Sequence, residues 1–74
     1  MEEIEFRLER DHVELNQLLK LCGLADSGGA GKALVSSGAV RVGGEVELRR
    51  TCKIHAGQVV QVDGVRIVVV DAVA

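Results

Sequence analysis

The stretch SGGAGKALVSSGAVRVGGEVELRRTCK, residues 27–53, decides how this chain is expected to fold. It opens with a serine, runs through small residues to Gly38, and then changes to the alternation Val40-Arg41-Val42. Such alternation is typical of a half-buried strand, and the Gly43-Gly44 pair after it favours a turn. The stretch therefore predicts a helix, a β-hairpin, and an irregular connection that contains Arg49 to Lys53.

The helix expected in this stretch starts near Asp26 or Ser27, since both are good capping residues, and ends at Gly38. Its three glycines each cost about 1 kcal/mol relative to alanine, so it needs tertiary support. Its first turn leaves backbone N–H groups with little shielding, which suits an anion. The apolar stripe of this helix is expected to consist of Ala30, Ala33 and Leu34.

A strand and another helix are expected before this stretch. Apolar residues alternate with charged ones from Ile4 to Leu8, which predicts a half-buried strand with an acidic outer face. Asp11 is the predicted N-cap of the helix, with Glu14 as its capping-box partner, and Gly23 is expected to end it. The predicted buried stripe of this helix is Leu15, Leu18, Leu19 and Cys22.

The remainder of the chain is predicted to be β. A three-residue turn, Gly43-Gly44-Glu45, is preferred for the first hairpin because it pairs Val42 with Val46 and keeps both valines on one face. Asp63-Gly64 is a strong signal for the turn of the last hairpin. That turn places Gln61 with Arg66 on one face and the following residues on the other: Val60, Val62, Val65 and Ile67.

Composition bounds the possible functions. Seventy-four residues, 47% of them hydrophobic, predict one folded domain spanning residues 1–74. Phe6 is the only aromatic residue, so the chain has no platform for stacking single-stranded bases. Cys22 and Cys52 are thirty residues apart with no partner at metal spacing, which indicates free thiols, no metal and no cofactor. The acidic N-terminus and the lack of a long apolar run favour a cytoplasmic protein.

Charge is distributed unevenly along the chain. The net charge is −2, but residues 1–14 sum to −4 and residues 15–66 to +3. Solvated surface charge is the plain interpretation of any single lysine or arginine. Together, however, the cations fall on or beside expected turns and helix ends, where a phosphate backbone can approach closely. The cations in question are Lys20, Lys32, Arg41, Arg49, Arg50 and Lys53.

Enzymatic patterns are incomplete. The run from Gly28 to Lys32 suggests a phosphate-binding P-loop, but Asp26 stands where that motif needs glycine and Ala33 where it needs Ser or Thr. His12 and His55 have no nucleophile at a suggestive spacing and are expected in exposed turns. We therefore expect no enzymatic activity.

Several short segments occur in a characteristic order: Leu18-Leu19-Lys20, Gly23-Leu24, Ser27, Lys32-Ala33-Leu34-Val35, Gly38, Val40 to Glu45, and Ala56 to Val60. Together they resemble the RNA-binding domain first known from small-subunit ribosomal protein S-four, also called the αL motif. Three segments, His12 to Leu15, Leu18 to Leu21 and Cys52-Lys53-Ile54, more closely resemble a bacterial subgroup of small stand-alone proteins of this type. The similarity covers about residues 12–70.

The resemblance implies an α+β fold with two antiparallel helices packed on a small, mostly antiparallel sheet, here with an extra N-terminal strand. It also implies binding of structured RNA, such as ribosomal or transfer RNA, through the second helix and the following hairpin. Glu14 and Gln17 stand where the family commonly has Arg and Lys, so those contacts are not carried over. The expected RNA-binding residues are Lys20, Ser27, Lys32, Arg41, Arg49, Arg50 and Lys53.

Two functions remain open at this point. The first is a non-enzymatic protein that binds structured RNA, with ribosome-associated proteins as further partners. The second is a protein–protein adaptor that docks through the acidic first strand and helix and makes no direct RNA contact.

Overall fold

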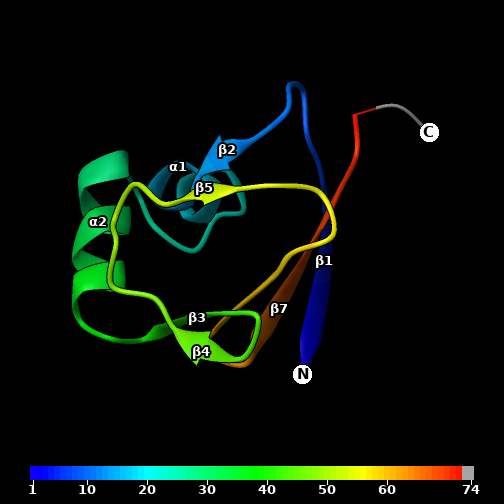
Figure 1. Cartoon of the computed structure of the whole chain (residues 1–74). Coiled ribbons are helices and arrows are strands. Elements are labelled where there is room, and N and C mark those ends of the chain that lie inside the picture. The colour runs from blue at the N-terminus through cyan, green and yellow to red at the C-terminus, as the bar shows by residue number, and fades with distance from the viewer. Residues whose placement is uncertain (73–74) are drawn as a thin grey trace.

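A computed structural model describes residues 1–72 of the chain. Strands and helices alternate irregularly along it, and Figure 1 shows helix α2 and strand β1 at opposite ends of the molecule. The elements are β1 (Glu2–Arg7), β2 (Val13–Glu14), α1 (Leu15–Leu21), α2 (Gly28–Ser36), β3 (Val40–Val42), β4 (Glu45–Val46), β5 (Lys53–Ile54), β6 (Val59–Val62) and β7 (Val65–Val70).

Five strands form one sheet in the order β1-β7-β6-β3-β4, and β2 pairs with β5 in a separate two-stranded sheet. Strands β1 and β7 run parallel, whereas the other strand pairs of these two sheets are antiparallel. The expected α+β fold with a mostly antiparallel sheet and an added N-terminal strand is therefore confirmed.

The core lies between the helices and one face of the large sheet. Leu15, Leu18 and Leu19 of α1 are fully buried, which confirms most of the predicted stripe, and Cys22 just beyond the helix is half-buried. Burial of one such side chain stabilises the fold by about 1.5–3 kcal/mol. The other fully buried or nearly buried apolar residues are Leu8, Val35, Val40, Ile54, Val60, Val62, Ile67 and Val69.

Helix α1 begins later than the sequence predicts. The prediction of Asp11 as its N-cap is wrong, because Glu14 holds that position with an extended backbone and makes no side-chain cap hydrogen bond. The physical reason is that Val13 and Glu14 are drawn into strand β2 by pairing with Ile54 and Lys53. The predicted end is confirmed, since Gly23 has the left-handed backbone (φ +78°).

Helix α2 has the predicted ends but a different buried face. The Ser27 hydroxyl oxygen accepts a 3.0 Å hydrogen bond from the N–H of Ala30, and Gly38 stops the helix with φ +82°. The predicted stripe is largely wrong, because Ala30 and Ala33 are exposed and Leu34 is only half-buried. Gly31 and Val35 face the core instead.

The two hairpins of the large sheet have different outcomes. Asp63-Gly64 forms the predicted two-residue turn, in which Val62 pairs with Val65. The three-residue turn predicted for the first hairpin is wrong, because Val42 pairs with Glu45 across Gly43-Gly44. Both glycines have positive φ, as this tight turn requires, and Glu45 and Val46 are both exposed, so burial does not enforce the other register.

Candidate nucleic-acid interface

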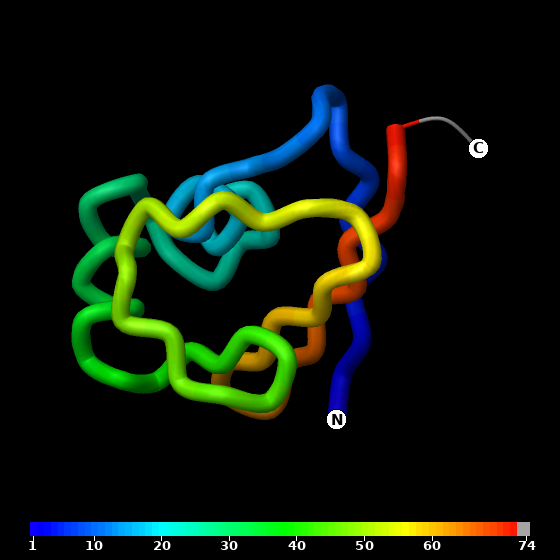
Figure 2. The backbone as a smooth tube through the Cα atoms, in the orientation of Figure 1, coloured from blue at the N-terminus to red at the C-terminus, as the bar shows by residue number. Residues whose placement is uncertain are grey.

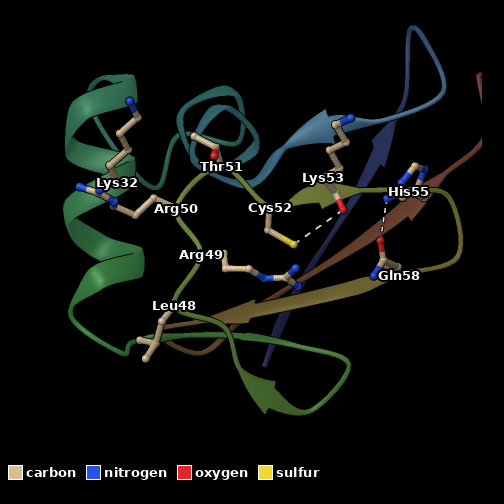
Figure 3. Close-up of a pocket in the computed structure, with 9 residues that line it drawn as sticks. All are labelled: Lys32, Leu48, Arg49, Arg50, Thr51, Cys52, Lys53, His55 and Gln58. Carbon is tan, nitrogen blue, oxygen red and sulfur yellow. Dashed lines mark hydrogen bonds between the residues drawn. The ribbon is translucent and has the colours of Figure 1, made fainter.

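A surface hollow lies between α2, the connection from β4 to β5, and the turn after β5. Figure 3 shows the side chains that line it, most of which come from one continuous segment. We call it the basic hollow, and its lining residues are Lys32, Leu48, Arg49, Arg50, Thr51, Cys52, Lys53, His55 and Gln58. Four of the seven predicted site residues, Lys32, Arg49, Arg50 and Lys53, are therefore brought together here.

The segment that carries most of these cations is fastened to the start of α1 through its backbone. The N–H of Leu15 donates a 2.8 Å hydrogen bond to the carbonyl of Cys52, and the N–H of Asn16 donates one of 3.2 Å to that of Arg50. The two loop carbonyls thus accept hydrogen bonds from N–H groups in the first turn of α1, which have no partner within the helix. Figure 2 shows the segment running from the β3–β4 hairpin along α2 and then across α1. Because two of its carbonyls accept from the helix, the segment is held while the side chains of Arg49, Arg50 and Lys53 stay exposed.

Lys32 reaches the basic hollow from α2. It lies one turn into that helix and is exposed, beside the buried face formed by Gly31 and Val35. Its neighbours on the surface are small, including Gly29 and Ala33, so a bulky polyanion can approach the helix closely. In Figure 3, Lys32 and Arg50 lie near each other at one end of the hollow.

The cations of the hollow differ in how they are paired. Arg49 donates from Nε to Glu47 Oε2 at 3.0 Å and from Nη2 to Glu47 Oε1 at 2.9 Å. Within residues 1–72, no carboxylate lies within ion-pair distance of Lys32, Arg50 or Lys53. Those three cations make no ion pair in that part of the chain, although Lys53 lies across the β2–β5 ladder from Glu14, whereas the charge of Arg49 is largely compensated.

The pairing also sets the ionisation of the carboxyl. Hydrogen bonds from the side chain and the backbone N–H of Arg49 lower the pKa of Glu47 to about 2. Glu47 therefore carries its negative charge at any physiological pH, and the Glu47–Arg49 pair is neutral overall.

The other three predicted residues lie outside the lining of the basic hollow. Lys20 is exposed on α1. Arg41 is exposed on β3 and donates from Nη1 to the carbonyl of Gly44 at 3.2 Å, across its own hairpin turn. The Ser27 hydroxyl serves as the cap of α2. These three residues belong to α1, to the β3–β4 hairpin and to the N-terminus of α2, respectively.

Sequence reasoning missed several residues of the hollow. Leu48 is 60% exposed at its edge although it is a large aliphatic residue, and nothing in the local pattern predicts this exposure. Gln58 closes the turn after β5, since its Oε1 accepts a 2.7 Å hydrogen bond from the N–H of His55. His55 is exposed in that turn, as predicted. The pairing of Glu47 with Arg49 was also missed. The sequence signal for it is an acidic residue two positions before an arginine in a segment expected to be irregular.

The described part of the chain also bears on other kinds of site. Cys22 and Cys52 are free thiols, as predicted, and burial raises the pKa of both. Residues 1–72 contain no group of three or more side chains suited to holding a metal ion. None of the helices in these residues has the length and apolar character needed to cross a membrane.

Two helices beside a mostly antiparallel sheet, with cations next to the second helix, match the arrangement expected of an αL-type domain. The sequence model of the S4 domain family matches residues 6–70, and the chain belongs to that family. It is also similar to YbcJ of Escherichia coli (strain K12), with 51% identity over 53 residues, which cover 72% of this chain and 76% of that protein.

Two further comparisons agree. The chain is 35% identical over 57 residues to RlbA of Bacillus subtilis (strain 168), named as a probable ribosome maturation protein, with 77% of this chain and 80% of RlbA covered. Its fold is similar to the solution structure of E. coli YbcJ, with a TM-score of 0.63, 46% identity, and coverage of 86% of this chain and 85% of the other. The YbcJ structure is described as revealing an αL motif involved in RNA binding.

Proposed function

We propose that this protein binds structured RNA through the basic hollow, as a non-enzymatic single domain spanning residues 1–74. The observation that carries the proposal is that Lys32, Arg50 and Lys53 line one hollow with no carboxylate partner among residues 1–72. When cationic side chains neutralise phosphates, the counterions condensed on the RNA are released, and this release gives affinity without sequence readout. Lys20, Ser27 and Arg41 extend this surface along α1, α2 and the β3–β4 hairpin.

The proposed class of RNA rests on the absence of an exposed Phe, Tyr or Trp among residues 1–72. Phe6, the only Phe, Tyr or Trp of the chain, is half-buried and packs against the core, so it offers no stacking platform in the hollow. Recognition through shape and phosphates favours folded RNA over single strands. Ribosomal or transfer RNA in the cytoplasm is the proposed target, with ribosome-associated proteins as neighbours, and the name of RlbA supports a ribosomal setting. Neither relative's name supports the alternative of an adaptor without RNA contact.

The decisive experiment reverses charge at the hollow and compares it with an equal reversal elsewhere. The test variant is K32E/R50E/K53E, and the matched control is R7E/R10E/R66E, whose residues lie outside the hollow. Both change the net charge by −6, so a difference between them reports position rather than total charge. Each is titrated by fluorescence anisotropy against a fragment of ribosomal RNA that forms hairpins, and against a single strand of equal length, at several salt concentrations.

We expect the wild type to prefer the folded RNA. The test variant should lose binding and flatten the salt dependence of log K by about 0.7–0.9 for each phosphate that it no longer neutralises, while the control keeps most of its slope. Circular dichroism should show both variants folded. Equal loss in the two variants would refute the assignment of the hollow. Ribonuclease treatment of a cell pull-down addresses the adaptor, because partners held by RNA are released and directly docked proteins are retained.

A further inference from the structure

Arg49 differs from the other cations of the basic hollow in both geometry and charge, because it is paired with Glu47, which does not itself line the hollow. Glu47 is fixed on the sheet, since its backbone N–H donates a 2.9 Å hydrogen bond to the carbonyl of Val40. Its side chain is only 17% exposed, whereas that of Arg49 is 77% exposed. Its Oε2 also accepts from the backbone N–H of Arg49 at 2.9 Å. A fixed carboxylate therefore holds a guanidinium that otherwise faces solvent.

The pair uses one edge of the guanidinium and leaves another free. Nε and Nη2 donate to the two carboxylate oxygens. Of the five N–H donors of an arginine, this leaves both on Nη1 and one on Nη2, which form the outer edge of the fork. In Figure 3, Arg49 extends across the hollow, away from Arg50, which points toward α2 and Lys32. The free edge of Arg49 is thus oriented before any ligand arrives.

Charge makes phosphate a poor ligand for this edge. The guanidinium is compensated by Glu47, so the pair attracts an anion far less than Lys32 or Arg50 does. A phosphate on the free edge would also be repelled by the carboxylate behind the guanidinium. A neutral group with two adjacent acceptors avoids that repulsion and still satisfies the two parallel donors.

Guanine is the base that offers such a group. Its O6 and N7 atoms lie side by side and accept a bidentate arginine pair. In a regular RNA helix these atoms lie in a deep, narrow groove that side chains cannot enter, so the guanine must be in a loop, a bulge or an end. We propose that Arg49, positioned by Glu47, reads one unpaired guanine, while the cations without carboxylate partners bind the phosphates around it. This inference rests on the proposed RNA binding and adds base specificity to it.

The first test is selection from a library of hairpin RNAs that share one stem and carry a randomised loop. Wild type, R49K and R66K are used at the same salt concentration. R49K keeps the charge but loses the planar fork. R66K is the matched control, because Arg66 is also near a carboxylate, with Nε 3.6 Å from Glu3 Oε1, but lies outside the hollow. We expect wild type and R66K to enrich guanine at one loop position. R49K should still select hairpins, but with no enrichment of guanine at that position.

The second test replaces the enriched guanine by 7-deazaguanine, which lacks the N7 acceptor but keeps O6. The wild type should lose affinity by less than the roughly 5- to 150-fold expected for loss of the whole bidentate contact, and R49K should be little affected. Loss of the same size in R49K would overturn the assignment of Arg49.

Glu47 has a signature of its own. In E47Q the guanidinium is no longer compensated, so affinity for a hairpin with no loop guanine should rise and the salt slope should steepen by about 0.7–0.9. The preference for guanine should fall at the same time, because the fork is no longer held. A purely structural role for Glu47 would weaken both kinds of binding together, and that result would overturn the proposal.

The outcomes also separate this inference from the function on which it rests. Wild-type pools that bind hairpins without guanine enrichment overturn the role of Arg49 and leave RNA binding intact. Failure of the wild type to bind any member of the library overturns both.

Discussion

The backbone carbonyl oxygen of Asn16 on α1 lies where a side chain on Gly31 of α2 would have to go. A Cβ placed on Gly31 would be 2.5 Å from that oxygen and 3.1 Å from the Cα and carbonyl carbon of the same residue. Backbone atoms inside a helix cannot move alone, so the two helices approach this closely only because residue 31 is glycine. The distance between α1 and α2 also fixes where Lys32 stands relative to the rest of the basic hollow.

The first prediction concerns this contact. G31A should lower the free energy of unfolding by about 1–3 kcal/mol, the usual cost of forcing extra volume into a packed interface. The matched control is G29A, where a Cβ would meet only the Ser27 hydroxyl at 3.8 Å. That change should stabilise the helix by up to about 1 kcal/mol, because alanine has the higher helix propensity. Urea unfolding measures both, and equal effects of the two substitutions would contradict the close approach.

The second prediction concerns the cap of α2. The Ser27 hydroxyl accepts from the N–H of Ala30 at 3.0 Å, so S27A should cost about 0.5–2 kcal/mol of stability. S27D should keep most of it, since aspartate caps equally well. S36A, at the exposed last residue of the helix, is the control and should change stability by no more than about 0.5 kcal/mol. Thermal unfolding of the three variants provides the measurement, and a harmless S27A would show that the cap does not stabilise the helix.

The third prediction concerns the connection between β4 and β5. Leu15 and Asn16 donate to the carbonyls of Cys52 and Arg50, although they are the first residues of α1. Their amide hydrogens should therefore exchange at least about tenfold more slowly than that of Gly29, at the exposed start of α2. Hydrogen exchange followed by NMR measures this directly. Rapid exchange at both positions would mean that the segment with Arg49 and Arg50 is not held against the helix.

Local signals in the sequence predict those parts of the fold that depend on neighbouring residues. The cap of α2, predicted as Asp26 or Ser27, the left-handed Gly23, the end of α2 at Gly38 and the Asp63-Gly64 turn each depend on contacts within a few residues. The structure confirms these predictions and selects Ser27 as the cap. The core stripe of α1 follows from its helical period in the same way.

The errors concern features that distant residues decide. The start of α1 is set by carbonyls and a strand partner more than thirty residues away, so the Asp11 capping box was a false signal. The buried face of α2 was missed because its contact point is Gly31, which carries no hydrophobic side chain to reveal it. In the candidate site, the charges of Lys32, Arg49, Arg50 and Lys53 could be read from the sequence. The compensation of Arg49 by Glu47 required the side-chain geometry.

The last prediction follows from the ionisation of Glu47. Its pKa in the folded protein is about 2, below the ordinary value of 4.5, because hydrogen bonds from Arg49 favour the carboxylate. A group whose pKa is lowered by folding stabilises the protein at pH values above its unfolded pKa. That stabilisation should therefore be complete above about pH 5 and should disappear progressively as the pH falls from about 4.5 to about 2.

Thermal unfolding of the wild type and E47Q across this range tests the sign. The wild type should be the more stable protein at neutral pH, and the difference should shrink steadily between pH 4.5 and pH 2 as Glu47 is protonated. E45Q removes one carboxylate from the neighbouring exposed strand and controls for the change in net charge. If the difference between wild type and E47Q stays constant down to pH 2, or grows, then Arg49 does not hold Glu47 ionised in solution. The neutral pair required for reading a guanine would then be absent as well.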